Sequence, residues 1–338
     1  MASVVDVHTH NYTHGWLSLI RDKGRPDYEI RESVDSPMTM YRRGASFGPL
    51  EPAHFDFDLR VKNMKAAGVE LAIITLSAPS AFWGDEAVST AAARIANDEF
   101  RAAQTAHPDH IRWMATLPWE YPAAAVAELE RALGRGAPAR GAAAQNAVGV
   151  LVLGNINGRH LTDPLFEPVW RAIDARALPV LLHPTVPPGA EALDLAQYAL
   201  VGSIGFMVDT SVAVVRMIFD GFFDRYPNLK LIASHAGATL PYIAGRLDRV
   251  FETAKRARAA IARPPSDYLR HIYYDSVCYR QDALQLCVDV GGEGRVLYGS
   301  DYPFNFGDMV GCLARVNALA APAREKARSA NALRIFGL

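Results

Sequence analysis

Short apolar runs recur along the whole chain, and most are continuous rather than alternating with polar residues. Continuous runs rich in Val, Ile and Leu are typical of strands buried on both faces, as in parallel sheets covered by helices. We therefore predict eight buried strands. They cover residues 3–8, 71–76, 111–117, 148–154, 178–184, 229–235, 271–277 and 295–301.

Helical patterns fill the intervals between these runs. Residues 58–68 end at Gly68, a residue typical of helix C-termini, and residues 121–134 carry Pro122 in their first turn. Strands that alternate with helices predict βαβ units, so the fold class is α/β and the expected architecture is a parallel barrel. An open doubly wound sheet is the alternative, but no GxGxxG follows a strand. Further helices are predicted at 85–106 and 163–177.

Two segments depart from the alternation. Residues 11–57 form a long insertion after the first strand, rich in Gly, Pro, Tyr, Arg and His and without a clear period. In a barrel, this insertion would lie over the mouth of the active site, where long loops are usually functional. Residues 134–147 have the composition of a flexible surface connection and do not mark a domain boundary. We therefore expect a single domain over residues 1–338.

Length, charge and cysteine content limit the possible functions. The 338 residues suit one α/β barrel with insertions, and the formal net charge of −1 argues against a surface for nucleic acid or anionic membranes. The three cysteines show no CxxC spacing, which indicates a reducing compartment without a disulfide framework. Residues 1–7 lack the basic start and long apolar stretch expected of a signal peptide, and we find no apolar run of about 18 residues. We therefore expect a cytoplasmic protein with no membrane span.

Metal-competent residues gather at the ends of four predicted strands. His8 and His10 end the first strand, His183 the fifth, His235 the sixth and Asp301 the eighth. In an α/β barrel, the C-terminal ends of the strands converge on one mouth, and active sites lie there. A single histidine in a strand is usually structural, but five such residues at one rim form a candidate site.

The residue types in this set suit a metal-dependent enzyme. Side chains two apart on a strand point the same way, so His8 and His10 can reach one ion together. His183 would add a third nitrogen and Asp301 a carboxylate oxygen, a set that suits Zn²⁺ with one position left for water. His235 then fits as an acid/base group or as a partner of that water.

Four stretches resemble the amidohydrolase superfamily and, within it, the 2-amino-3-carboxymuconate-6-semialdehyde decarboxylase family. They are DVHTH, LPVLLHP, LIASHAGATLPYIAGRLD and LYGSDYPF, in that order along the chain. The resemblance implies a distorted (β/α)8 TIM barrel that holds one Zn²⁺. It implies His8, His10, His183 and Asp301 as metal ligands and His235 as the catalytic acid/base. Strand 148–154 has no lysine of the kind that bridges two metals in other members, so one ion is expected.

The resemblance also implies residues that bind the substrate. The arginine after the first strand matches Arg42, with Arg43 as the alternative, and a second arginine matches Arg246. In the family the second arginine reaches the neighbouring subunit's site, which implies a homodimer. A planar guanidinium suits a carboxylate because it pairs with both oxygens. Phe304 matches the family and would pack on a planar substrate.

Three functions are compatible with these residues. The first is non-oxidative decarboxylation of a small unsaturated or aromatic carboxylic acid, which the resemblance favours. The second is metal-dependent hydrolysis of a lactone, ester or amide in a carboxylated substrate, since both reactions begin with an activated water. The third is a non-catalytic binding barrel, which would be marked by the loss of one of the five residues. The chain departs from the family after His183, where HPTVPPGAEALDLAQYALVG contains no tryptophan.

Overall fold

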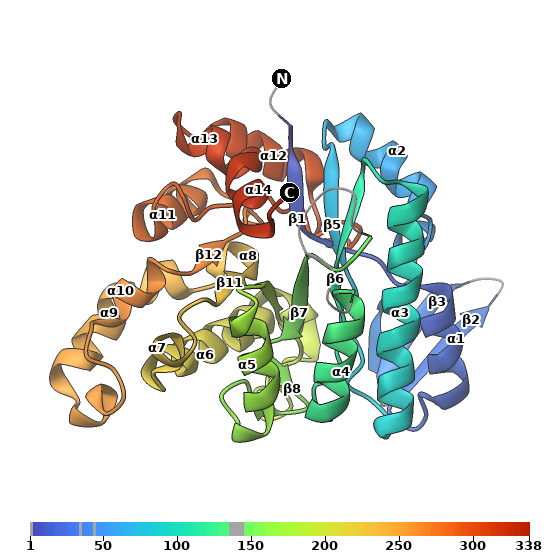
Figure 1. Cartoon of the computed structure of the whole chain (residues 1–338), viewed down its shortest axis with the longest axis horizontal. Coiled ribbons are helices and arrows are strands. Elements are labelled where there is room, and N and C mark those ends of the chain that lie inside the picture. The colour runs from blue at the N-terminus through green and yellow to red at the C-terminus, as the bar shows by residue number, and fades with distance from the viewer. Residues whose placement is uncertain (1–2, 34–35, 43–44, 135–144) are drawn as a thin grey trace.

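A curled, fully parallel sheet forms the centre of the molecule (Figure 1). The computed structural model describes residues 3–33, 36–42, 45–134 and 145–338. Within these residues the sheet has seven strands in the order β1-β5-β6-β7-β10-β11-β12. Their bounds are β1 Val5–His10, β5 Leu71–Thr75, β6 Ile111–Ala115, β7 Gly149–Leu153, β10 Pro179–His183, β11 Lys230–Ala233 and β12 Tyr273–Tyr274.

Burial explains why these runs form strands. Every residue of β1, β6, β7 and β10 is buried, as expected for strands covered on both faces. The parallel register places His10 beside Thr75 of β5 and His183 beside Leu153 of β7. The histidines therefore lie at the same carboxyl edge of the sheet, as the sequence predicts.

The eighth predicted strand, residues 295–301, differs from the expectation. It forms no regular strand, but it fills the gap between the two edges of the sheet. Val296 forms a parallel bridge with Tyr274 of β12, and the Val7 N–H of β1 donates to the Tyr298 carbonyl at 3.0 Å. The segment thus closes a distorted barrel, and its irregular course carries Asp301 to the mouth.

Helices cover the outside of the sheet (Figure 1). Helix α2 (Phe57–Ala67) ends at Gly68, whose φ of 76° is the left-handed conformation that favours glycine at a helix end. Helix α3 (Glu86–Ala106) begins after Asp85, whose carboxylate accepts from the Val88 N–H at 2.9 Å. The other main helices are α4 Pro122–Ala132, α5 Glu167–Ala175, α6 Phe206–Phe219, α9 Leu240–Thr253, α11 Gln281–Gly291, α12 Met309–Asn317 and α14 Asn331–Phe336.

The described residues of the insertion after β1 form regular elements rather than a structureless loop. It contains helix α1 (His14–Lys23) and an antiparallel sheet of β2 (Tyr28–Ser33), β3 (Ser36–Arg42) and β4 (Ala45–Pro49). A short 3-10 turn, η1 (Pro52–His54), then leads into α2. The insertion supplies part of the wall of the cavity described below. The predicted flexible connection at 134–147 falls mostly outside the described residues.

One stretch differs from the expectation that no segment is suited to a membrane. Gln197–Phe219, which ends with α6, is long and apolar enough to cross a membrane, with a mean hydropathy of 1.6. A single helix of this kind is weak grounds for a membrane span, because core helices share its composition. Asp209 in α6 is buried and accepts from the Thr185 N–H at 2.9 Å and the Asn155 amide at 2.8 Å. These bonds hold the helix against the ends of β7 and β10.

Candidate metal centre

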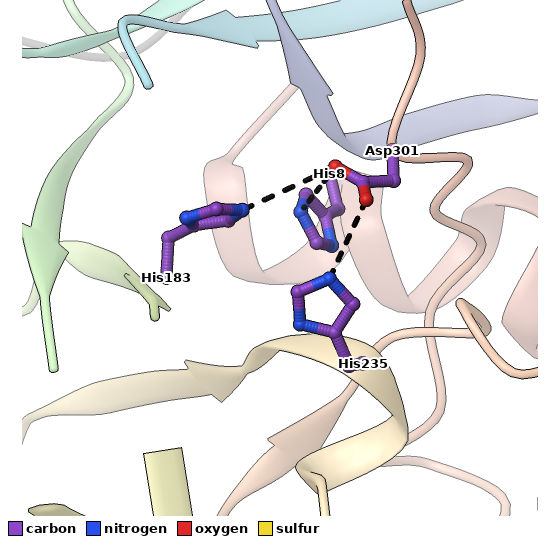
Figure 2. A group of neighbouring side chains, drawn as sticks. All are labelled: His8, His183, His235 and Asp301. Atoms are coloured by element: carbon purple, nitrogen blue, oxygen red, sulfur yellow. Dashed lines mark hydrogen bonds and ion pairs between the residues drawn. The ribbon is translucent and has the colours of Figure 1, made fainter. Parts of the chain in front are cut away.

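Three histidines meet one carboxylate at the mouth of the barrel. The Oδ1 atom of Asp301 lies 3.2 Å from His10 Nε2, 3.3 Å from His8 Nε2 and 4.0 Å from His183 Nε2. Figure 2 shows His8 and His183 turned toward Asp301 from opposite parts of the sheet. The structure therefore brings together the four residues that the sequence predicts as ligands.

The four facing atoms share one property: each is buried and has no hydrogen-bond partner in the part of the chain that the structure describes. His8 Nε2, His10 Nε2, His183 Nε2 and Asp301 Oδ1 all belong to this group. Leaving a single buried polar atom unpaired costs about 1–3 kcal/mol, so four at one point call for a common partner. A cation fits this point, because three nitrogens and one oxygen can each donate a lone pair to it.

The opposite edge of each ring fixes where its proton lies. His8 Nδ1 donates to the Asp275 carboxylate at 2.5 Å, and His183 Nδ1 donates to the Pro184 carbonyl at 2.9 Å. His10 Nδ1 lies 2.8 Å from the hydroxyl of Thr75, which itself donates to the Thr9 carbonyl and so accepts from the imidazole. In the neutral rings all three Nε2 atoms therefore keep a lone pair, the arrangement that metal-ligating histidines need.

Without a metal, His10 and His183 are neutral, whereas His8 carries the positive charge that a bound cation would replace. Burial lowers the pKa of His10 to about 4 and holds the pKa of His183 well below its usual value, so both rings are neutral. Burial also opposes charge on His8, but Asp275 and Asp301 outweigh it and raise its pKa to about 10. Burial alone would raise the pKa of Asp301, yet the surrounding imidazoles hold it well below its usual range. The site thus favours positive charge beside two ionised carboxylates.

His235 approaches from the opposite side on a strained turn. It lies just after β11, and its φ of 55° and ψ of 51° are left-handed, a conformation rare for non-glycine residues and concentrated at functional sites. Its Nε2 lies 3.4 Å from Oδ2 of Asp301, and its Nδ1 has no partner among the described residues. Figure 2 shows the ring directed at the carboxylate.

The donor set fits a divalent transition metal. One ligand atom from each of His8, His183, His235 and Asp301 lies within 4.8 Å of the others, so this group could hold an ion. His10 belongs to the same cluster, because its Nε2 is the closest histidine nitrogen to Oδ1 of Asp301. His235 faces the other carboxylate oxygen, which separates it from the three unpaired Nε2 atoms. Imidazole and carboxylate ligands suit Zn²⁺ and Mn²⁺.

Asp275 connects this cluster, although it is not among the residues predicted from the sequence. Asp275 follows β12 and is fully buried. Besides binding His8, its carboxylate accepts from the backbone N–H of His235 at 2.9 Å and of Ala236 at 2.8 Å. These bonds hold the left-handed turn in place. An acidic residue at the end of a buried strand is the same signal that singles out Asp301. The sequence therefore contains a signal by which Asp275 could have been predicted.

A large cavity opens above the cluster. Its volume is about 1760 Å³, and its lining includes His183, His235 and Asp301 together with Arg42 and Phe304. The Phe304 ring lies 5.2 Å from the His10 ring, which places it beside the cluster. Most other lining side chains are apolar, including those in the stretch that replaces the family's tryptophan segment: Val186, Leu195, Ala196, Ala199 and Val201.

The predicted substrate arginines fall in different places. Arg42 lies on β3, lines the cavity and is half-buried, with its guanidinium 5.9 Å from the Tyr28 ring. Its alternative, Arg43, lies outside the described residues. Arg246 is exposed on α9 and is not among the residues that line the cavity. The structure thus brings one predicted arginine to the site within its own chain and leaves the other on the surface.

Comparison with known proteins places the geometry in context. Residues 5–338 match the protein family described as amidohydrolase. The 2-amino-3-carboxymuconate-6-semialdehyde decarboxylase of Dictyostelium discoideum is 26% identical over 99% of this chain and 91% of its own length. The gamma-resorcylate decarboxylase of Polaromonas sp. is 30% identical over 83% of this chain and 87% of its own length.

A solved structure extends the similarity to three dimensions. The dihydroxybenzoic acid decarboxylase of Polaromonas sp., crystallised with manganese and 2-nitroresorcinol, superimposes with a TM-score of 0.80 at 25% identity. The match covers 99% of this chain and 97% of that protein. The similarity therefore spans the barrel, the insertion and the C-terminal helices alike.

The contacts of Asp275 predict its effect on metal binding. Asp275→Asn removes the negative charge and one of the two oxygens that accept from His8 and from the backbone of His235 and Ala236, and weakening such a partner costs about 10- to 100-fold in metal affinity. Titration of the metal-free protein with Zn²⁺ in competition with a chelator would measure the loss. Asp58→Asn is the matched control, because that side chain is 91% exposed and pairs with His107 rather than with a residue of the cluster. Equal affinities for both variants would contradict the role of Asp275.

Proposed function

Because the chain belongs to the amidohydrolase family, we propose that it is a metal-dependent, non-oxidative decarboxylase of a small aromatic or unsaturated carboxylic acid. The observation that carries this proposal is the set of three unpaired Nε2 atoms and one unpaired carboxylate oxygen facing a single point beside a cavity. The relatives favour decarboxylation over the hydrolytic alternative, because those named above are all decarboxylases.

His8, His10, His183 and Asp301 would hold one divalent ion, and we propose Zn²⁺ as that ion. Three imidazoles and one carboxylate form a donor set that Zn²⁺ prefers. The manganese in the relative from Polaromonas sp. makes Mn²⁺ the competing choice. When bound, the ion would supply Lewis-acid stabilisation of negative charge on the substrate's oxygens.

His235 is proposed as the acid/base residue. Its Nδ1 is unpaired, and its ring lines the cavity on the side of Oδ2 of Asp301. His235 would deliver a proton to the carbon that bears the carboxylate, which makes that carbon tetrahedral. The bond to the carboxylate then breaks, its electrons restore the conjugated system, and CO₂ leaves. The imidazole recovers a proton from solvent, so each turnover consumes one proton.

Arg42 and Phe304 are proposed to orient the acid. No carboxylate among the described residues is paired with Arg42, so its guanidinium is available to an anionic substrate. Phe304 offers a ring face between the cluster and the outer cavity, on which a planar acid would stack. Holding the acid in one orientation supplies much of the rate enhancement in reactions of this kind.

We propose that the enzyme is a homodimer and that Arg246 acts across the interface. Arg246 is exposed and lies away from the cavity of its own chain. A stripe of exposed apolar residues, Ile204, Val208 and Val212, follows one face of the helix that ends with α6. Such a stripe marks an interaction surface, and a second copy is the proposed occupant.

We also propose a cytoplasmic location. The three cysteines of the chain are free thiols in the structure, which suits a reducing compartment.

Turnover tests the function directly. Zinc-loaded protein is mixed with hydroxybenzoates, carboxymuconate semialdehydes and small lactones, while CO₂ and the substrate's ultraviolet absorption are followed together. We expect stoichiometric CO₂ from at least one acid and no opening of the lactones. His235→Asn should lower the rate about 10²- to 10⁴-fold with normal metal content. His160→Asn, an exposed histidine, is the control. Lactone hydrolysis without CO₂ would overturn the proposal.

The role of Arg42 in substrate binding is tested by a substitution that removes its charge and keeps a long polar side chain. Arg42→Gln should lower kcat/KM about 10- to 100-fold, because a charged hydrogen bond contributes about 1.5–3 kcal/mol. Most of the loss should appear in KM. Arg31→Gln on the neighbouring strand removes an exposed arginine that stacks on Tyr41 and should leave kcat/KM unchanged. Equal kinetics for both variants would remove Arg42 from the substrate site.

The dimer proposal is tested by combining two inactive chains. His235→Asn and Arg246→Ala are coexpressed with different affinity tags, and the mixed dimer is isolated through both tags. One of its two sites then has an intact His235 and receives Arg246 from the other chain, so about half the wild-type activity should return. A mixed dimer as inactive as its parents, or a monomer by light scattering, would rule out the shared site.

A further inference from the structure

His54 is a buried histidine that the proposed mechanism does not use. It ends η1 in the insertion, is only 2% exposed and lines the cavity. Its ring stacks on Tyr12 with centroids 5.6 Å apart and lies 5.3 Å from the Phe304 ring. Together with Tyr12 and Phe304 it forms an aromatic wall beside the metal centre.

The surroundings of the ring decide which nitrogen carries its proton. The Glu51 backbone N–H donates to Nδ1 of His54 at 3.0 Å. The Glu51 carbonyl, 3.2 Å from the same nitrogen, already accepts from the His54 backbone N–H at 2.9 Å. An N–H group can only donate, so Nδ1 is the acceptor of this pair and the proton lies on Nε2.

The Nε2–H group has no acceptor. Nε2 is buried and lacks a hydrogen-bond partner among the described residues, as do the three metal-facing nitrogens. Because the Glu51 backbone holds Nδ1 and His54 lines the cavity, Nε2 is the nitrogen left for a group bound in that cavity. A buried donor without an acceptor is costly, and such groups in native proteins usually serve a ligand or an ordered water.

We infer that the Nε2–H of His54 is a specificity determinant that donates a hydrogen bond to an oxygen on the substrate's ring. The inference rests on the proposed function only in placing a planar acid in this cavity. Phe304 contacts both His10 and His54, at 5.2 and 5.3 Å. One aromatic ring therefore spans the gap between the metal centre and His54. A substrate ring stacked there would present a hydroxyl or a second carboxylate to His54 while its reacting carboxylate lies at the metal.

The charge of His54 distinguishes it from Arg42. Burial lowers the pKa of His54 to about 4, so the ring is neutral at physiological pH. A neutral donor selects an acceptor by position rather than by charge. The substrate class that follows is a planar acid with a second oxygen substituent, and an acid without that substituent would leave the donor unpaired.

The test compares binding rather than turnover. Dissociation constants of benzoate and of the 2-, 3-, 4-hydroxy- and dihydroxybenzoates are measured calorimetrically for zinc-loaded protein in a His235→Asn background, which keeps the acids intact. With His54 present, at least one hydroxylated isomer should bind about 3- to 10-fold more tightly than benzoate. His54→Phe should abolish that preference and change benzoate binding less than twofold. His54→Gln, which keeps an amide donor, should retain part of it.

The outcomes separate this inference from the proposed function. A preference that survives in His54→Phe, or no preference for any hydroxylated isomer with His54 present, would overturn the role of His54. Absence of CO₂ from all acids in the turnover experiment would instead contradict decarboxylation. The binding comparison would still test the role of His54. If His54→Phe fails to fold in a thermal melt, His54→Leu serves as the variant without a donor.

Discussion

A single buried carboxylate, that of Asp275, holds the parts of the active site in relation to one another. It binds the imidazole of His8 from the first strand and the backbone of His235 and Ala236 after β11. Three segments of the barrel are thereby joined at one point beneath the cavity. The cost of burying a carboxylate is offset because each of its oxygens has donors and a positive partner nearby. Without it, the orientation of His8 and the left-handed turn would both lack support.

The hydrogen bonds beneath the cluster explain why its side chains need little rearrangement to bind an ion. His8, His10 and His183 are each fixed through Nδ1 by a different element of the fold. Their Nε2 atoms therefore point inward before any ion arrives. A site of this kind binds by selection of a fitting ion rather than by rearrangement, and the same rigidity then orients a substrate above it.

The sequence predicted the ligand cluster because strand ends in a parallel barrel share one edge. His8, His10, His183, His235 and Asp301 are all where strand assignment placed them, although the segment that carries Asp301 forms no regular strand. The fold of the insertion could not be predicted in the same way. Its sheet depends on pairing between distant residues such as Tyr28 and Arg42, which a local pattern does not encode. Likewise, the unpaired Nε2 of His54 could not be predicted, because it depends on the hydrogen bond between the Glu51 backbone N–H and Nδ1.

The two ends of the chain meet at the metal centre, and this has a consequence for biosynthesis. His8 lies in the first strand, while its partner Asp301 lies 293 residues later. At about 5–20 residues per second, a ribosome needs roughly 15–60 s between the two. During that interval the nascent chain exposes a pair of histidines with no carboxylate to complete the site. The complete cluster therefore forms only when the barrel closes, and not when its first two histidines leave the ribosome.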